Sequence, residues 1–466
     1  MKSKKILISV LIGCLPFLVG LNKIFFGFEY EDAFINSHVG LQDNISFFFS
    51  NFRTKGCTEY FNGNCHELKA YPGHYISYAF LIKVTSFIYS NPYFTHRFLN
   101  FFLVVISFSS LILLLPKDIF RKEILPFFLI IISLLPFMYV FNSSLIENLS
   151  FSLGIIIIVV VYLNDRNESE KLKILFLILI GVICIIKREN LVYFFLIPLI
   201  FKKEDCKNYR LLLATAVILL IQIVINPFYT EGIESKDLNR STFSIDYLAF
   251  QLPVYLKSLV SIKGFLFLTI FALLRKPNKK SIYFIFVFIL FLVTYSLHYR
   301  SRYAIESSNI SLLETYRYLV NTIPFVLGYI LFSKGILFKY PKFIYGILIA
   351  SVLSYNYSFH IMEDFINDEI RNYHVVNEII EDSLNDTESC LILDNFVLIS
   401  LLNKKNMNID IIEYNTFIYQ EYQSNSYDKI YLINRFGTSK IKIDSHLRKI
   451  DSLSKSSTDV YQVIGY

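Results

Sequence analysis

The sequence has little charge, no tryptophan and no visible internal repeat. Charged residues make up 18% of the 466 positions, compared with about 25% in a soluble domain. Apolar residues make up 54%, and the mean hydropathy is +0.48. This balance excludes an ordinary soluble enzyme. The lack of a repeat weighs against a transporter, because many transporter folds are built from internal repeats.

The charge that is present is net basic, +7 at pH 7, but no arm or single patch concentrates it. The basic residues are spread over short segments between apolar runs. Chains that bind nucleic acid instead gather lysine and arginine on one face or along one segment. The sequence therefore predicts no nucleic-acid partner, and the basic residues are better explained as signals of membrane topology.

Cysteine is scarce, and the six cysteines show no metal-ligand spacing. Four of them are isolated in the sequence: Cys14, Cys184, Cys206 and Cys390. Cys57 and Cys65 form a plausible couple, because a turn-prone Asn-Gly step lies between them. Two interpretations are open for this couple, a local disulfide in an oxidising compartment or two free thiols.

Apolar runs long enough to cross a bilayer recur through the first 356 residues. The first run, at 6–26, follows Lys2, Lys4 and Lys5 and has no small-residue cleavage site. It is therefore predicted to be a retained helix with a cytoplasmic N-terminus. Further spans are predicted at 97–115, 124–141, 149–163, 174–186, 191–201, 211–225, 262–274, 281–297, 318–333 and 343–356. The predicted fold is an all-α polytopic membrane bundle of about eleven transmembrane helices.

Alternate loops of this predicted bundle carry the lysines and arginines. They are Lys117, Arg121 and Lys122; Arg166, Lys171 and Lys173; Lys202, Lys203, Lys207 and Arg210; Arg275, Lys276, Lys279 and Lys280; and Lys334, Lys339 and Lys342. The positive-inside rule makes these loops cytoplasmic, and an odd helix count leaves the C-terminus outside. The segment 74–90 would reverse this order if it spanned, so we expect an interfacial helix there. The predicted location is the plasma (inner) membrane.

The region after residue 356 differs in pattern, because apolar residues recur at helical spacing among acidic ones and short β-like runs follow. The β-like runs are Cys390–Asp394, Ile409–Tyr414, Lys429–Asn434 and Val460–Ile464. We predict two units. The first is a transmembrane unit at 1–356 with its first outer loop at 27–96, and the second is a small extracytoplasmic α/β domain at 357–466.

Three carboxylates fall within four positions just beyond the first predicted span: Glu29, Glu31 and Asp32. Crowded carboxylates repel one another and raise at least one pKa, which suits a general base or a cation site. A solvated loop at the membrane surface is the plainer interpretation.

Residues 31–35, Glu-Asp-Ala-Phe-Ile, resemble the Asp-Asp-Ala-Tyr-Ile version of a segment found in the GT-C glycosyltransferases. These enzymes take sugars from polyprenyl phosphates at the outer face of the membrane. Similar local patterns follow in the family's order: Tyr71-Pro72-Gly73-His74-Tyr75, Thr95-His96-Arg97, Glu147 in the second outer loop, Lys187-Arg188 and Arg317-Tyr318. The resemblance extends to about residue 335, and the tail matches only in placement.

The resemblance implies an inverting sugar transfer in one displacement, with membrane lipid around the enzyme. The donor would be a polyprenyl-phosphate sugar, and the acceptor an extracytoplasmic glycan, lipid or protein. Glu31 or Asp32 would act as the base. Which of the two acts is open, because Glu31 stands where the family has Asp. Lys187, Arg188 and Arg317 would bind the donor phosphate.

The resemblance also singles out Glu147, His74 and Tyr318 as candidates for substrate binding, with Glu147 as a second acid. A divalent cation, Mg²⁺ or Mn²⁺, bridging Glu31, Asp32 or Glu147 to phosphate would suit their hard oxygen ligands. The family includes members that need no metal, so the sequence leaves metal dependence open.

Plainer interpretations exist for the cations. Lys187 resembles a helix-end lysine that extends to the interface while Glu189 neutralises a neighbour, and Arg317 resembles an interfacial anchor beside Tyr318. Two other functions compete for the whole chain. A polysaccharide polymerase or ligase is not expected to place paired acids after the first helix. A flippase or transporter predicts charges at helix centres, which are nearly absent here.

Overall fold

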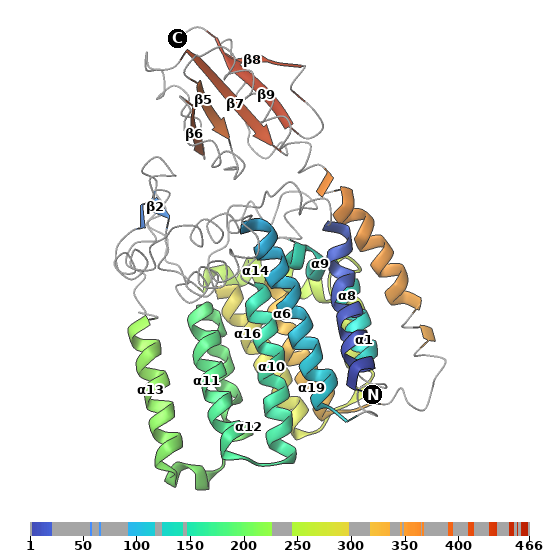
Figure 1. Cartoon of the computed structure of the whole chain (residues 1–466), viewed down its shortest axis with the longest axis vertical. Helices are drawn as coiled ribbons and strands as arrows, with labels where there is room; N and C mark the ends of the chain where they lie inside the picture. The colour runs from blue at the N-terminus through green and yellow to red at the C-terminus, as the bar shows by residue number, and fades with distance from the viewer. Residues whose placement is uncertain are drawn as a thin grey trace.

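A computed structural model of the chain describes residues 2–20, 56–57, 65–66, 92–116, 124–142, 147–225, 245–297, 317–335, 345–346, 349–364, 366–367, 390–394, 409–413, 428–435, 447–451, 454 and 458–464. This part is mostly helical, and a small sheet lies near the C-terminus (Figure 1). The sheet and the N-terminus lie at opposite ends of the molecule (Figure 1). A helical bundle with a small C-terminal sheet is the coarse architecture that the sequence predicts.

A close antiparallel pair of helices starts the bundle. The pair consists of α1 (Lys2–Cys14) and α6 (Pro92–Leu114), and the 3₁₀ helix η1 (Leu15–Gly20) directly follows α1. The Ser9 and Ser109 hydroxyl oxygens lie 2.8 Å apart, and Gly13 faces Val105. A Cβ added to Gly13 would lie only 2.8 Å from the Val105 side chain. The pair can therefore approach this closely because residue 13 has no side chain.

A sharp break divides the helix that the sequence predicts at 124–141. Its halves are α8 (Leu125–Ser133) and α9 (Leu135–Asn142). They are bent by 73°, because the ring of Pro136 would clash with the carbonyl four residues earlier in a continuous helix. The Ser133 carbonyl at the break accepts hydrogen bonds from the Ser354 and Ser358 hydroxyls, at 3.3 and 2.9 Å. These bonds satisfy a backbone group at the break.

The helix that supplies those two serines runs over 349–364 and crosses the boundary predicted at residue 356. The Tyr355 hydroxyl donates to the Leu15 carbonyl at 2.8 Å, and Met362 is fully buried in the bundle core. The first turns beyond residue 356 therefore pack with the helical bundle.

The centre of the bundle is α10, which contacts α6, α11 and α19. The central elements are α10 (Glu147–Arg166), α11 (Glu170–Ile186), η4 (Arg188–Leu196), α12 (Ile197–Ile200), α16 (Lys279–Leu297), η6 (Tyr318–Thr322) and α19 (Ile323–Phe332). A Cβ on Gly154 would overlap the Tyr193 hydroxyl and lie 2.7 Å from Pro324. Glycine at this position lets α10, η4 and α19 meet.

The described residues contain two helices that are long and apolar enough to cross a membrane, α10 and α16. The bent pair α8–α9 makes a third if it counts as one span. About eleven spans are predicted from the sequence, so that count exceeds what the described helices show. One reason is that several predicted spans are short or irregular. The span predicted at 191–201 is mostly the 3₁₀ helix η4, and the one predicted at 318–333 begins with η6.

Basic segments gather at one end of the central helices. Lys173 Nζ lies 2.7 Å from Asp205 and 2.6 Å from Glu168. Lys202 also pairs with Glu168, and Lys280 pairs with Asp165. Glu147 lies at the other end of α10, about 28 Å away at 1.5 Å per residue. The positive-inside rule predicts that the basic end is cytoplasmic.

The remaining helical elements lie beside this core. They are η5 (Lys203–Lys207), α13 (Tyr209–Ile225), α14 (Asp246–Leu259) and α15 (Leu266–Leu273), with the short strands β3 (Arg275–Lys276) and β4 (Lys334–Gly335). The tight turn between α14 and α15 depends on Gly264, because a Cβ there would overlap the Ser258 carbonyl. This turn forms one side of the cavity described below.

The C-terminal sheet has five strands in the order β6-β5-β7-β9-β8. They are β5 (Cys390–Asp394), β6 (Ile409–Glu413), β7 (Lys429–Arg435), β8 (Leu447–Lys449) and β9 (Thr458–Val463). β5 pairs in parallel with β6 and β7, and β9 is antiparallel to β7 and β8. Four strands lie where the sequence predicts them, and β8, with only three residues, is not predicted.

Candidate functional site

An ion pair buried between α10 and α11 forms the centre of the candidate site. Lys187 Nζ lies 2.8 Å from Glu147 Oε1, and the two side chains are 2% and 0% exposed. Glu147 begins α10 and Lys187 directly follows α11, so the antiparallel packing of these helices brings the charges together. A buried charge without a partner costs several kcal/mol, so each member of the pair stabilises the other.

Two tyrosine rings and a second cation surround the Lys187 ammonium. Its Nζ lies 5.2 Å from the centre of the Tyr295 ring and 4.9 Å from that of Tyr318. The Arg317 guanidinium lies 4.9 Å from the same Tyr318 ring and donates a 3.0 Å hydrogen bond to its hydroxyl. Ring faces attract cations, so Tyr318 holds two of them. Arg317 and Tyr318 are partly exposed, whereas Lys187 is buried.

Two cations act on the buried carboxylate of Glu147. They are Lys187, which is bound to it, and Arg317. Because Arg317 is the partly exposed cation, an incoming anion would meet its positive charge before that of Lys187.

Amide side chains surround the ion pair. Asn190 donates to the Ser150 hydroxyl at 3.0 Å, and Asn321 donates to the Tyr295 hydroxyl at 3.1 Å. Asn148 is fully buried, yet neither atom of its amide has a hydrogen-bond partner in the part of the chain that the structure describes. We call the following residues the polar cluster: Glu147, Asn148, Lys187, Tyr295, Arg317 and Tyr318.

The polar cluster brings together four residues that the sequence analysis singles out: Glu147, Lys187, Arg317 and Tyr318. Three others, Glu31, Asp32 and His74, lie outside the described residues. Arg188 begins η4, but its side chain is also outside the described part. The structure thus groups the predicted second acid with two of the three predicted phosphate-binding cations.

Lys187 is buried, and the predicted contact of its ammonium with a donor phosphate stays a prediction. Its ammonium is bound to Glu147 and enclosed by Tyr295 and Tyr318, so it does not extend to a membrane surface. Arg317 is the more accessible of these two cations.

A metal ion fits poorly on Glu147. One carboxylate oxygen is occupied by Lys187, and the charge of Arg317 also acts on the group, so a divalent cation would be repelled. Among the described residues, no group of three or more His, Cys, Asp or Glu side chains could hold a metal. A cation bound by Glu31 and Asp32 stays a prediction.

The predicted cysteine couple lies on two short paired strands. β1 (Gly56–Cys57) and β2 (Cys65–His66) are antiparallel, with Cys57 directly opposite Cys65. The Cα atoms of directly opposed residues in such a pair are about 4.5–5.5 Å apart, within the range that a disulfide spans. The backbone register is compatible with a bridge, which stays a prediction.

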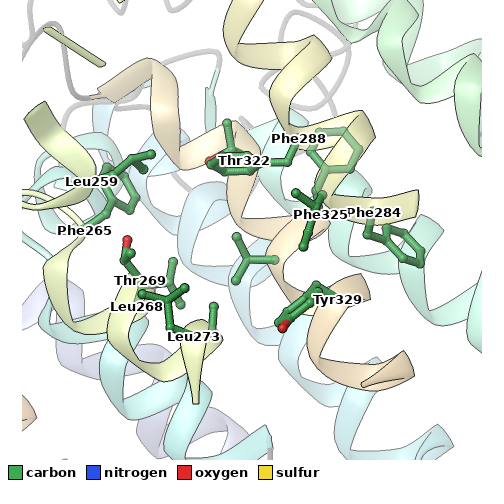
Figure 2. Close-up of a pocket in the computed structure, with 13 residues that line it drawn as sticks. Leu259, Phe265, Leu268, Thr269, Leu273, Phe284, Phe288, Thr322, Phe325 and Tyr329 are labelled. Atoms are coloured by element: carbon green, nitrogen blue, oxygen red, sulfur yellow. The ribbon is translucent and has the colours of Figure 1, made fainter. Parts of the chain in front are cut away.

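An apolar cavity of about 210 Å³ lies between α15, α16 and α19. Figure 2 shows phenylalanine and leucine side chains around this space, with Thr322 and Tyr329 among them. Thr322 ends η6, the 3₁₀ helix that directly follows Arg317. At about 2 Å rise per residue, the cavity therefore begins roughly 10 Å along the chain axis from the Arg317 backbone. The lining suits a hydrocarbon chain.

Comparisons with protein-family models, curated proteins and solved structures found no match to this chain. The site is therefore interpreted from its own residues and from the local resemblance of its sequence segments.

No sequence motif identifies Asn148, Tyr295 or Asn321 as functional residues. Asn148 carries a signal nonetheless, because Glu147, Asn148, Ser150 and Ser152 place four polar residues in the first two turns of an apolar helix. Polar residues inside a membrane helix are costly and indicate a function or a partner. Tyr295 carries no such signal, because tyrosine is frequent throughout this chain.

Proposed function

We propose that this chain is a multi-pass membrane glycosyltransferase of the GT-C type, which transfers a sugar from a polyprenyl-phosphate donor to an extracytoplasmic glycan, lipid or protein. The observation that carries the proposal is the polar cluster, in which Arg317 is a partly exposed cation beside the buried pair of Lys187 and Glu147. Arginine binds phosphate oxygens through charge-assisted hydrogen bonds. The resemblance of residues 31–35 to the GT-C segment supplies the reaction type.

The cations have different roles in this proposal. Arg317 binds the donor phosphate, and Arg188 is a second phosphate ligand. Lys187 is a positioning residue, because it holds Glu147 through one oxygen and supports Tyr318 through its ring. The ordered Tyr318 in turn orients Arg317 through the hydrogen bond between them. Preorganised cations stabilise the charge that develops on a departing phosphate.

The apolar cavity supports a lipid-linked donor. A polyprenyl phosphate needs an anion site and a hydrocarbon site on one path. Arg317 and Thr322 stand at the two ends of such a path along η6. In the proposal, the cavity between α15, α16 and α19 receives part of the polyprenyl chain.

The reaction is a single displacement that inverts the anomeric carbon. Glu31 or Asp32 takes the proton of the acceptor hydroxyl as its oxygen bonds to the sugar carbon. The bond from that carbon to the phosphate oxygen breaks, and the phosphate leaves as an anion bound by Arg317. Mg²⁺ or Mn²⁺ on the two acids, where present, would neutralise phosphate charge.

The proposed topology has eleven spans in the plasma membrane, with the N-terminus cytoplasmic and the C-terminal sheet outside. Two observations support it. The N-terminus and the sheet lie at opposite ends of the molecule (Figure 1). The basic segments around Lys173, Lys202 and Lys280 form ion pairs at the end of the bundle opposite to Glu147.

The direct test is a donor screen with the purified full chain in detergent. Labelled sugar transfer is measured from several polyprenyl-phosphate sugars to membrane extracts that contain glycan, lipid and protein acceptors. Transfer from at least one donor is expected. If no donor is consumed while the folded chain joins preformed glycan chains, the polymerase or ligase alternative replaces this proposal.

Arg317→Ala should then lower transfer by roughly 10²–10³-fold, because a contact to the leaving phosphate is lost. Arg166→Ala is the matched control. Arg166 lies 4.8 Å from the Tyr162 ring at the other end of α10, in the same kind of contact that Arg317 makes with Tyr318. Equal losses in the two variants would mean that Arg317 acts through stability alone.

The proposed base is tested with Glu31→Gln and Asp32→Asn, which keep size and remove the carboxylate. Loss of a general base typically costs about 10²–10⁴-fold in rate, whereas donor binding at Arg317 should change less. Wild-type rates in both variants would assign these acids to a solvated loop.

A further inference from the structure

Asn148 is an unusual buried residue. Its side chain is fully buried on α10, and in the described part of the chain neither its Nδ2 nor its Oδ1 has a hydrogen-bond partner. The neighbouring Glu147 is also fully buried, and its Oε2 has no partner in another described residue. Buried polar atoms are nearly always hydrogen-bonded, so adjacent unsatisfied groups require an explanation.

The carboxylate of Glu147 is held in one orientation. Lys187 holds the other oxygen of Glu147, so the orientation of the carboxylate is set. The nearby Ser150 hydroxyl is already used by Asn190. Three unsatisfied groups thus lie on adjacent residues, one carboxylate acceptor, one amide donor and one amide acceptor.

The charges around these groups restrict the class of ligand. A second anion would be repelled by the Glu147 carboxylate, and a cation by Lys187 and Arg317. An apolar group would leave the amide unsatisfied. A neutral ligand with several hydroxyl groups avoids both repulsions. It also satisfies the amide, because each hydroxyl both donates and accepts.

We propose that Glu147 Oε2 and the Asn148 amide bind hydroxyl groups of the transferred sugar while Arg317 binds its phosphate. This inference rests on the proposed function and deepens it by assigning the residues that recognise the sugar. Different side chains thus recognise the phosphate and the sugar. Phosphate affinity therefore depends on Arg317, and discrimination among sugars depends on Glu147 and Asn148.

The test measures binding to the full chain in detergent by calorimetry. The probes are inorganic phosphate and three hexose 1-phosphates that differ in hydroxyl configuration, those of glucose, mannose and galactose. At least one hexose 1-phosphate should bind about tenfold more tightly than inorganic phosphate, because it adds hydrogen bonds to a charged acceptor. The three should also differ from one another.

Asn148→Leu should abolish the tighter binding of the hexose 1-phosphate and leave the binding of inorganic phosphate unchanged. Leucine has nearly the same size, and replacing an unsatisfied amide by an apolar group should not lower the melting temperature. If leucine does impair folding, Asn148→Ala provides the same comparison with less crowding. Ser152→Ala is the matched control on α10, because Ser152 Oγ is also buried without a partner in the described residues. It should leave binding of every probe unchanged.

The outcomes separate the two proposals. If wild type binds inorganic phosphate and all hexose 1-phosphates equally, or if both Asn148 variants keep the tighter binding of the hexose 1-phosphate, the assignment of sugar recognition is wrong. A buried water would then explain the unsatisfied amide. If wild type binds none of the probes, or if Arg317→Ala binds phosphate as wild type does, the proposed phosphate site itself is wrong.

Discussion

Each end of the α10–α11 pair holds a buried lysine, but the two lysines have different surroundings. At the basic end, Lys173 contacts both Glu168 and Asp205, and Lys202 contacts Glu168 as well. Two cations face two carboxylates, so this network is neutral. At the other end, Lys187 faces Glu147 while Arg317 adds a second positive charge.

The comparison separates a structural network from a candidate site. In the neutral network, Lys173 reaches both oxygens of Asp205. In the polar cluster, Glu147 Oε2 and the Asn148 amide lack partners among the described residues. Unsatisfied buried groups cost stability, so each of them needs an explanation, such as a ligand or a buried water. A buried lysine by itself does not indicate a function.

The largest expected difference between the two ends is their side of the membrane. A reporter fused after residue 466 should be extracytoplasmic, and a reporter inserted in the 202–210 segment should be cytoplasmic. Alkaline phosphatase activity and fluorescent-protein fluorescence distinguish the two compartments. If both sites report the same side, the proposed span count is wrong, and the assignment of the polar cluster to the outer face is wrong with it.

The second prediction compares the two buried lysines by stability. Lys187→Met should destabilise the chain by about 3–5 kcal/mol, because Glu147 would be left fully buried and unpaired. Lys173→Met should cost only about 1–2 kcal/mol, because Glu168 is 43% exposed, Asp205 is 15% exposed and water can solvate both. Denaturant unfolding in detergent measures both changes.

The control for Lys187→Met is the double variant with Glu147→Gln. Removing both charges should recover at least half of the lost stability, because no unpaired charge remains buried. Equal stability of the single and double variants would show that Lys187 stabilises the fold by packing and not through its ion pair.

The third prediction concerns the close packing beneath the polar cluster. Gly154→Ala should destabilise the chain by about 1–3 kcal/mol, since the new Cβ would overlap the Tyr193 hydroxyl and press on Pro324. Gly346→Ala is the control, because no atom of the described residues lies within 4 Å of a Cβ there. It should be neutral or slightly stabilising, as expected for alanine in a helix. Equal melting temperatures for the two variants would contradict the packing at Gly154.

The smallest expected effect is a pH dependence confined to the basic end. Hydrogen bonds from Lys173 and Lys202 lower the pKa of Glu168 from 4.5 to about 2. A lowered folded-state pKa contributes stability that is present above pH 4.5 and is lost as the pH falls towards 2. Hydrogen exchange around 166–173 should therefore accelerate over this range in wild type. Glu168→Gln should show less of this acceleration. If the pH dependence of hydrogen exchange is unchanged in this variant, other groups cause the acceleration.

The sequence predicts those elements whose signals are local. Apolar runs with polar flanks predict β5 at Cys390–Asp394 with the same bounds, and α16 within two residues of its start. The break between α8 and α9 is missed although Pro136 lies in the printed sequence, because prolines also occur within single helices. In α14, for example, Pro253 lies inside a continuous helix.

In the candidate site, too, the sequence predicts some features and misses others. The sequence identifies Glu147, Lys187, Arg317 and Tyr318 as residues of interest through the local resemblance of their segments to a known family. It does not determine their partners. Lys187 is bound to Glu147, a residue forty positions away, only because α10 and α11 pack antiparallel. Which polar atoms stay unsatisfied was decided by tertiary packing, since hydrogen bonding depends on distances of a few tenths of an ångström that no local pattern encodes.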